Sequence, residues 1–339
     1  MKTLIAKLRN GIDLTSGDIN YAMSMLLSES TEDGMKAEFL MALHRKGESV
    51  EEIVAFVQQL IDRAIDPLID RKNLSGPMLD VCGTGGDGLD LFNVSTTIMF
   101  VLAAGGVAVV KHGNRSVTSR CGSADVLEAL GLAIPPDARS AAASLEATGF
   151  TFLFAPHYHP ATARVAPVRA ALGVRTVFNI LGPLVNPAQP PLHLVGAFSL
   201  DVAGLMADTF QGLPIERAFV VHGAEGWDEP TPIGPFTLFD VRPGQVSRSV
   251  RSPEQYALER CRPVDLAGGN AAHNARSLEA VLSGQERGAH RDCLLLGTAL
   301  ALELHGATQD PLEGVARAAA AIDSGAARRV LEALRRGRS

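Results

Sequence analysis

In Met78-Leu79-Asp80-Val81 followed by Gly83-Thr84-Gly85-Gly86, a short apolar run leads straight into a glycine-rich loop. This pattern is typical of a strand that ends in a loop and is followed by a helix. Apolar runs that end in glycine loops recur at residues 106–113 and 218–223. Three such units predict an α/β fold with a mainly parallel sheet, whose strand ends carry the functional site.

The N-terminal part of the chain carries a helical pattern instead. Apolar residues between Ile53 and Ile61 recur on one helix face, and Ser49 with Glu52 supplies a capping box. Pro67 then disfavours continuation of the helix. Because 339 residues exceed the usual size of a single core, we expect a small helical domain that ends near residue 70. Residues 164–181 also look helical, but pattern alone does not place them in the fold.

The composition excludes several classes of protein. A net charge of −6 lacks the basic excess that nucleic-acid binding needs, so no nucleic-acid partner is expected. The most apolar stretch, residues 94–110, is interrupted by hydroxyls and glycines, so no membrane span is expected. The N-terminus lacks the apolar core of a secretory signal. Four distant cysteines without a C-x-x-C pair indicate a reduced, cytoplasmic setting.

The first functional motif is the loop Gly83-Thr84-Gly85-Gly86-Asp87-Gly88, with Asn93-Val94-Ser95-Thr96 shortly behind it. Glycines let backbone N–H groups approach phosphate oxygens, and Ser95 can open a helix whose positive end favours anions. The loop matches neither the dinucleotide-binding nor the P-loop pattern. A tight turn that only needs glycine conformations is the alternative, which the polar Asn-x-Ser-Thr sequence disfavours.

The second motif, Lys111-His112-Gly113-Asn114-Arg115, brings two cations and an amide into one loop after an apolar strand. Such a loop can clamp anions, with further hydroxyls at Ser116, Thr118 and Ser119. Ser123 is expected to cap the helix that follows. A solvated basic loop is the alternative, but the buried character of the strand favours a site.

The third motif is the pair Asp228-Glu229, beyond the apolar run at 218–221. Carboxylate oxygens combined with phosphate oxygens form a typical magnesium site. Adjacent acids are usually solvated, so the pair gains its meaning from the two phosphate-binding candidates.

At these stretches the chain resembles the anthranilate phosphoribosyltransferase family. The family motifs G-T-G-G-D-G with N-[IV]-S-T, K-H-G-N-R and G-S-A-D-V-L-E-A-L-G all stand here, the last at residues 122–131. Further matches lie at residues 39–48, 159–161 and 175–184. The resemblance implies a small N-terminal helical domain, residues 1–70 with a returning segment at about 164–184. This domain would be hinged to a large α/β domain, residues 76–163 and 185–339.

The resemblance also implies the activity, in which the amine of anthranilate attacks phosphoribosyl pyrophosphate and pyrophosphate leaves. It implies Mg²⁺, with two ions per subunit, and a homodimer formed through the helical domains. Carried over by position, the donor would contact Gly83, Gly86, Asp87, Asn93, Val94, Ser95, Thr96, Lys111, Ser119 and Ser123. Anthranilate would contact Gly83, His112, Asn114, His159 and Arg169, and the metal Ser95, Asp228 and Glu229. His112 is a candidate general base, although a role in positioning the acceptor is equally compatible.

Five positions depart from the family pattern, and two other functions stay open. The departures are Leu91 for threonine, Arg120 for lysine, Cys121 for serine, Trp227 for leucine and Gly297 for a frequent asparagine. Leu91 removes a hydroxyl near the phosphates and Trp227 alters the acidic loop, so donor affinity is less defined than donor identity. A pyrimidine nucleoside phosphorylase would share the two-domain plan, but its K-x-S-T-G-G-x-G-D loop is absent. A non-catalytic, nucleic-acid-binding relative is disfavoured by the net charge and by the complete acidic pair.

Overall fold

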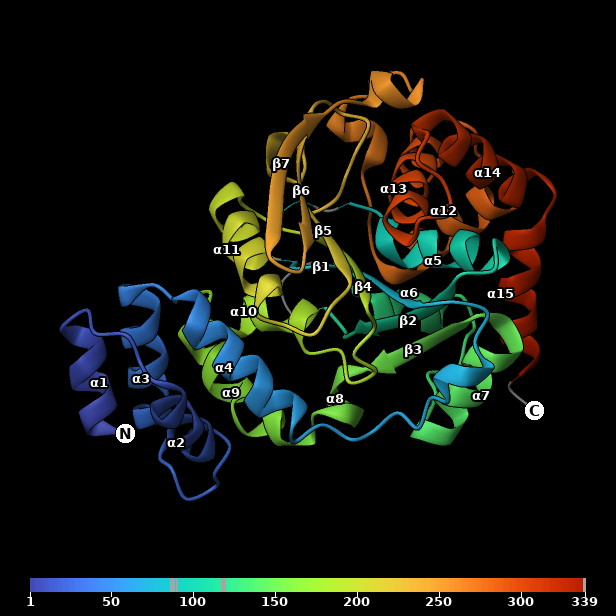
Figure 1. Cartoon of the computed structure of the whole chain (residues 1–339). Coiled ribbons are helices and arrows are strands. Elements are labelled where there is room, and N and C mark those ends of the chain that lie inside the picture. The colour runs from blue at the N-terminus through green and yellow to red at the C-terminus, as the bar shows by residue number, and fades with distance from the viewer. Residues whose placement is uncertain (86–88, 90, 117–119, 338–339) are drawn as a thin grey trace.

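A twisted sheet forms the centre of the protein (Figure 1). The computed structural model describes residues 1–85, 89, 91–116 and 120–337. In this part of the chain the sheet has seven strands in the order β3-β2-β1-β4-β5-β6-β7. The strands are β1 (Met78–Gly83), β2 (Ala108–Gly113), β3 (Phe150–Phe154), β4 (Leu192–Gly196), β5 (Arg217–His222), β6 (Phe236–Arg242) and β7 (Gln245–Arg251). The first five in chain order run parallel and β6 and β7 are antiparallel, which confirms the mainly parallel sheet.

The three predicted strands are β1, β2 and β5. The third unit differs from the first two, because the loop after β5 leads to the antiparallel strand β6 and not to a helix. Strands β3, β4, β6 and β7 were not identified from the sequence. In the register of β1 with β4, Gly83 pairs with Gly196, so the carboxyl ends of these two strands lie side by side. This pairing sets the floor of the candidate site.

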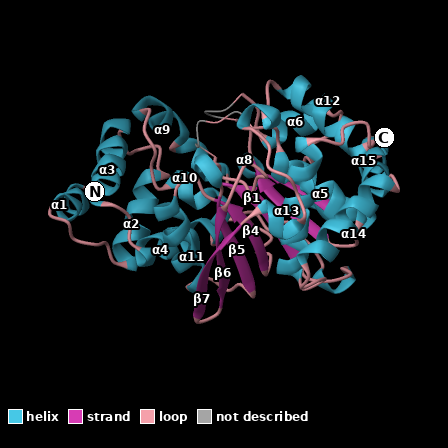
Figure 2. Ribbon diagram, turned by 90° about the horizontal axis from the view of Figure 1, so that it is seen from above, coloured by secondary structure: helices cyan, strands magenta, loops and turns pink. Residues whose placement is uncertain are grey.

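Helices cover both faces of the sheet, as Figure 2 shows from above. Leu192 and Leu194 of β4 face one core, and Val195 faces the other, as the period of two in a strand requires. The first core is closed by α5 (Val94–Ala104), α6 (Ser123–Ala129), α12 (Ala271–Leu282), α13 (Ala289–His305), α14 (Pro311–Asp323) and α15 (Ala326–Arg336). Helix α11 (Leu200–Gln211) covers the opposite face, and α7 (Ala138–Thr148) packs on β3.

The N-terminal residues form a small helical unit beside the α/β part (Figure 1). It comprises α1 (Lys2–Arg9), α2 (Ser16–Leu26), α3 (Asp33–Lys46) and α4 (Val50–Ile61). The predicted capping box of α4 is present, since the Glu52 N–H donates to Ser49 Oγ at 3.3 Å and the Ser49 N–H donates to Glu52 at 2.8 Å. The apolar side chains of this unit join those of α11 in one continuous core.

The helical segment expected at residues 164–181 is broken in the structure. It consists of η2 (Pro160–Arg164), α9 (Ala166–Leu172), α10 (Phe178–Leu181) and η3 (Gly182–Leu184), with α8 (Ala155–Tyr158) before them. Gly173 ends α9 with a φ of 62°, a left-handed conformation that glycine adopts without steric cost. Helix α9 packs against α3, so the segment returns to the N-terminal helical unit.

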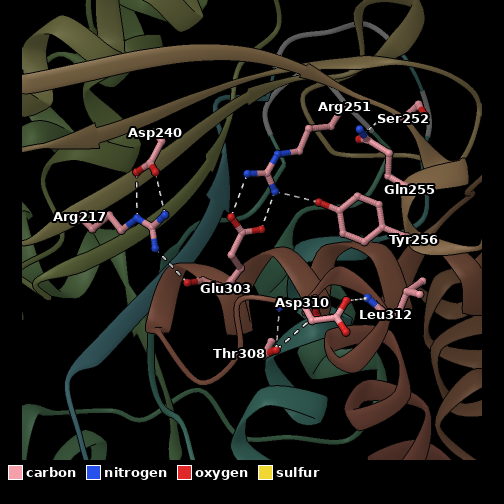
Figure 3. A network of polar contacts seen from close by, with 10 residues as sticks. All are labelled: Arg217, Asp240, Arg251, Ser252, Gln255, Tyr256, Glu303, Thr308, Asp310 and Leu312. Carbon is pink, nitrogen blue, oxygen red and sulfur yellow. Dashed lines mark hydrogen bonds and ion pairs between the residues drawn. The ribbon is translucent and has the colours of Figure 1, made fainter.

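A polar network ties the antiparallel edge of the sheet to α13 (Figure 3). Arg251 of β7 donates to the Glu303 carboxylate at 2.5 and 2.8 Å and to the Tyr256 hydroxyl at 2.9 Å. Arg217 of β5 binds Asp240 at 2.7 and 2.8 Å and the Glu303 main-chain oxygen at 2.9 Å. Glu303 therefore joins the sheet edge to the helix layer.

We expect Glu303→Ala to lower the free energy of unfolding by about 2–3 kcal/mol, because it leaves the Arg251 guanidinium half-buried without its carboxylate. Glu332→Ala is the matched control, since Glu332 pairs only with Arg328 among the described residues, in a solvent-exposed i,i+4 ion pair that should contribute little to stability. Urea denaturation of both variants checks the difference. Equal losses in the two variants would show that the network does not stabilise the fold.

Candidate active site

The carboxyl ends of the parallel strands open into a cavity of about 410 Å³. All thirteen predicted site residues that the structure describes line it. They are Gly83, Asn93, Val94, Ser95, Thr96, Lys111, His112, Asn114, Ser123, His159, Arg169, Asp228 and Glu229. Gly86, Asp87 and Ser119 lie outside the described residues. The three motifs thus meet in one cavity, although Gly85 of the first and Asp228 of the third are 143 residues apart in the sequence.

Three glycines at strand ends hold the acidic pair close to the sheet. A Cβ added to Gly196 would lie 1.5 Å from the main-chain oxygen of Asp228, and one added to Gly83 would lie 2.4 Å from its Oδ2. A Cβ on Gly223 would lie 2.2 Å from the Glu229 oxygen. The close approach of the two backbones therefore requires glycine at these positions.

The two carboxylates bind backbone amides of the first motif. The Gly85 N–H donates to Asp228 Oδ2 at 2.6 Å, and the Ser95 N–H at the start of α5 donates to Glu229 Oε1 at 3.2 Å. These are amides that the sequence assigned to phosphate. A phosphate can use them only after the carboxylates rotate away. The acidic pair and the phosphate-binding loop therefore share one set of donors.

The oxygen ligands available in the cavity suit a Mg²⁺ ion that a phosphorylated substrate helps to bind. Among the described residues no three His, Cys, Asp or Glu side chains are grouped closely enough to hold a metal alone. Mg²⁺ is usually bound by one or two carboxylates together with phosphate oxygens and water. Asp228, Glu229 and the Ser95 hydroxyl line the cavity in which a phosphorylated ligand would supply the remaining oxygens.

Lys111 is buried beneath the first motif. Its Nζ donates to the main-chain oxygen of Val81 at 2.5 Å and to Ser95 Oγ at 3.3 Å. Asp80 lies behind it and accepts hydrogen bonds from the His112 N–H at 3.3 Å and from Asn186 at 2.8 Å. Burial raises the pKa of Asp80 to about 6, and the charge of Lys111 acts in the opposite direction. The ammonium therefore has a carboxylate on its protein side and the cavity on the other.

The second cation of the loop lines the cavity and also forms an ion pair within the protein that the sequence did not predict. Arg115 donates to the two oxygens of Glu128 at 2.6 and 2.7 Å, so its charge is neutralised within the protein. Ser123 is also not the helix cap that was predicted, because Gly122 occupies that position. Its hydroxyl donates to the Asn114 main-chain oxygen at 3.2 Å instead. These contacts tie residues 114–115 to α6.

His112 and His159, two of the predicted acceptor residues, lie next to each other in the wall of the cavity. Their rings meet edge to face with centroids 5.3 Å apart. His112 Nδ1 lies 3.1 Å from the Gly182 oxygen, and since a carbonyl only accepts, Nδ1 carries the proton. His112 Nε2 is buried, and no hydrogen-bond partner for it occurs among the described residues. It is therefore an unsatisfied acceptor on a residue that lines the cavity.

Burial lowers the pKa of His112 to about 3 and also lowers the pKa of His159. Because the pKa of His112 in the folded protein lies below its value in the unfolded chain, the folded ring stays neutral below about pH 6.5 while the unfolded one takes up a proton. The free energy of unfolding therefore falls as the pH drops from about 6.5 towards 3. We expect His112→Gln to leave the shape of the pH profile of acceptor kcat/KM unchanged between about pH 5 and 8. An acid limb near pH 6.5 that disappears in this variant would contradict a neutral His112.

Arg169 of α9 lines the cavity and belongs to a segment of the chain outside the three motifs. Its guanidinium lies 5.2 Å from the centre of the Phe178 ring, and burial lowers its pKa. The segment that carries it is fixed by the N-terminal helices, because the buried Lys36 Nζ donates to the Arg164 main-chain oxygen at 3.3 Å. A partly desolvated guanidinium favours a carboxylate partner.

Several cavity residues were not predicted from the sequence. Thr84 anchors the glycine loop, since its N–H donates to the Gly196 oxygen at 2.9 Å and its Oγ1 accepts from the Phe198 N–H at 3.2 Å. Asn179 and Pro183 belong to the matched stretch at 175–184 and could have been found there. Gly269 belongs to the pair Gly268-Gly269, whose position after an irregular segment gave no signal.

Two departures from the family pattern have a physical explanation. A Cβ on Gly297 would lie 2.2 Å from Ile98 Cδ1, so Ile98 fills the space that a side chain at 297 would need. Trp227 is buried in the main core and accepts the Gly223 N–H at 2.8 Å through its main-chain oxygen. Its size is therefore absorbed by packing, and the backbone of the acidic loop stays bound to the end of β5.

Comparison with known proteins agrees with this geometry. Residues 2–64 match the glycosyl transferase family, helical bundle domain, and residues 75–328 match the glycosyl transferase family, a/b domain. An anthranilate phosphoribosyltransferase from Solibacter usitatus is 47% identical over 95% of this chain and 94% of its own. One from Moorella thermoacetica is 44% identical over 98% and 97%. The chain belongs to the anthranilate phosphoribosyltransferase family.

Solved structures of anthranilate phosphoribosyltransferases share the whole fold. The crystal structure of the Thermus thermophilus protein gives a TM-score of 0.89 at 39% identity and covers 98% of both chains. The Saccharomyces cerevisiae protein in complex with PRPP and Mg gives 0.88 at 28% identity, covering 99% of this chain and 98% of its own. Membership of the family confirms the resemblance drawn from the motifs, and with it the helical unit joined to a larger α/β domain. No helix of the described residues is long and apolar enough to cross a bilayer.

Proposed function

We propose that this chain transfers the phosphoribosyl group of 5-phosphoribosyl 1-pyrophosphate to the amine of anthranilate. The products are N-(5-phosphoribosyl)anthranilate and pyrophosphate, in a step of tryptophan biosynthesis. The observation that carries the proposal is the single cavity that joins a phosphate-binding loop, a buried ammonium, an acidic pair and a separate wall with Arg169 and His112. One side suits a pyrophosphate, and the other suits an aromatic amine with a carboxylate.

The donor side would act mainly through charge. Lys111 and the amides of the glycine loop and of the α5 start stabilise the negative charge that develops on the leaving pyrophosphate. Asn93, Thr96 and Ser123 line the same side and would contact the donor, together with Gly86, Asp87 and Ser119. When bound by Asp228, Glu229 and Ser95, Mg²⁺ would neutralise phosphate charge, and we propose two ions per subunit.

The acceptor side would act mainly through orientation. Arg169 would hold the anthranilate carboxylate, and the lone pair on His112 Nε2 would accept a hydrogen bond from the amine. An aromatic amine is nucleophilic without a strong base, and a histidine with a lowered pKa is a weak one. We therefore assign His112 to orienting the amine. Asn114 and His159 complete this wall.

We propose further that the protein is a homodimer formed through the helical unit, in a cytoplasmic setting. Of the eight exposed large hydrophobic side chains among the described residues, five lie in residues 1–70 and 164–184. They are Ile12, Tyr21, Ile65, Leu68 and Val174, each between 43% and 55% exposed. These two segments would form one domain and residues 76–163 and 185–339 the other. All four cysteines are free thiols, which suits a reducing compartment.

Sedimentation at micromolar protein tests the dimer, which buries the five apolar side chains on each chain. We expect a single dimeric species. Replacing Ile12 and Leu68 together by serine should shift the equilibrium towards monomer. The same change at Val250 and Leu312, which are at least as exposed on the α/β part, should not. A wild-type chain that sediments only as monomer would contradict the proposal.

Anthranilate fluorescence tests the proposed activity. It should fall when the donor and Mg²⁺ are both present and stay constant when either is missing. Release of thymine from thymidine in phosphate buffer would instead support a nucleoside phosphorylase. Salt-dependent binding of DNA without turnover would support a nucleic-acid-binding relative.

A further inference from the structure

Asn274 of α12 is a buried amide that lies outside the cavity yet reaches a residue that lines it. Its side chain is 1% exposed. Its Oδ1 accepts the Gly269 N–H at 2.7 Å, and its Nδ2 donates to Asn93 Oδ1 at 2.9 Å. Asn93 precedes α5 and lines the donor side of the cavity. No motif of the sequence pointed to Asn274.

The two amides form a chain with a fixed direction. The Gly269 N–H can only donate, so Asn274 must turn Oδ1 towards it and Nδ2 towards Asn93. At the other end, Asn93 Nδ2 donates to the main-chain oxygen of Cys121 at 3.3 Å, and this oxygen can only accept. Neither amide can flip without placing two donors or two acceptors against each other. The orientation of Asn93 is therefore set from both sides.

The hydrogen bonds of these two amides join three segments on the donor side of the cavity. Gly269, Asn93 and Cys121 all line the cavity and come from the segment before α12, the start of α5 and the loop before α6. Direct backbone packing reinforces the first contact, since a Cβ on Gly268 would lie 2.5 Å from the Leu91 oxygen. None of these hydrogen bonds involves Arg169 or His112. The hydrogen bonds of Asn274 and Asn93 therefore do not reach the two residues assigned to the acceptor.

We propose that Asn274 is a positioning residue for the donor, acting through Asn93. It holds the Asn93 side chain, and through it the main chain at Cys121, in the arrangement that receives the ribose and phosphate groups. Asn274 touches neither substrate. The inference rests on the proposed function only in taking the ligand of this wall to be a phosphorylated sugar.

The test combines kinetics with a mutant cycle. Asn274→Ala should raise the KM of the donor about 10-fold and leave the KM of anthranilate within twofold. Asn274→Asp keeps the size of the side chain and the acceptor for the Gly269 N–H but removes the donor to Asn93, and it should show the same selective defect, which guards against loss of packing as the cause. Asn270→Ala is the matched control, because Asn270 caps the same helix through the His273 N–H at 2.9 Å without contacting Asn93. It should lower the unfolding midpoint and leave the donor KM unchanged.

The double variant Asn93→Ala/Asn274→Ala decides whether Asn274 acts through Asn93. If it does, the double variant binds donor no more weakly than Asn93→Ala alone. Additive losses, or equal rises in both KM values, would overturn the inference. Calorimetric titration of the same variants with pyrophosphate and Mg²⁺ gives the cycle without turnover. It therefore decides the inference even where the wild-type chain fails to consume anthranilate, an outcome that would refute the proposed function alone.

Discussion

Replacing Asp228 and Glu229 together by alanine is expected to lower kcat/KM for the donor by about 100-fold or more. Two charge-assisted contacts of about 1.5 kcal/mol each are lost, and with them the protein ligands of the metal. The fold should persist, because the contact of Gly196 is with the main chain of Asp228, which alanine keeps. The contact of Gly83 is with the Asp228 carboxylate, whose removal only relieves crowding. Steady-state kinetics with the donor varied at several Mg²⁺ concentrations measures the loss.

Asp228→Asn/Glu229→Gln separates charge from structure. The amide oxygens can still accept the N–H groups of Gly85 and Ser95, whereas the negative charge is gone. We expect this variant to unfold at the wild-type midpoint and to lose as much activity as the alanine pair. If either double variant keeps its activity, or if a chelator does not lower the activity of the wild type, Asp228 and Glu229 do not bind a catalytic metal.

Arg169→Ala is expected to raise the KM of anthranilate about 10-fold or more while the KM of the donor moves far less. One charge-assisted contact of about 1.5–3 kcal/mol with the acceptor carboxylate is lost. Arg169→Lys should recover only part of the affinity, because an ammonium lacks the planar fork that binds both carboxylate oxygens. Kinetics with each substrate varied in turn measures both constants.

Arg164→Ala is the matched control for this substitution. Arg164 lies five residues earlier on the same segment, is half exposed and pairs with Glu29. Its loss should change neither KM by more than about twofold, since exposed ion pairs contribute little. A variant of Arg169 that is impaired only towards the donor would sink the assignment of this residue to the acceptor.

The site residues could be predicted where the chemistry is written into a short stretch. Glycine loops after apolar strands located the carboxyl edge of the sheet, and parallel pairing then brought Gly83 and the acidic pair together. The capping box of Ser49 with Glu52 is a local signal and was equally readable. Local patterns sufficed because each feature depends on neighbours in the sequence.

Features that depend on distant partners could not be predicted. Arg115 looked like an anion clamp, but its charge is taken by Glu128 on the helix that follows. The helical pattern at 164–181 continued through Gly173, whereas the structure ends α9 there. Asn274 reaches Asn93 across 181 residues, a contact that no periodicity or motif encodes. Packing between segments decides the first and the third, whereas the end of α9 at Gly173 is a local glycine signal that the helical pattern outweighed.

The most direct test of the proposed transfer is its stoichiometry. Pyrophosphate released and anthranilate consumed should be measured in one reaction with Mg²⁺ and the donor. Phosphoribosyl transfer predicts that one pyrophosphate is released for each anthranilate consumed. Once the metal is chelated, no pyrophosphate should be released and no anthranilate consumed. Pyrophosphate release that continues without anthranilate, or anthranilate loss without pyrophosphate, would contradict it.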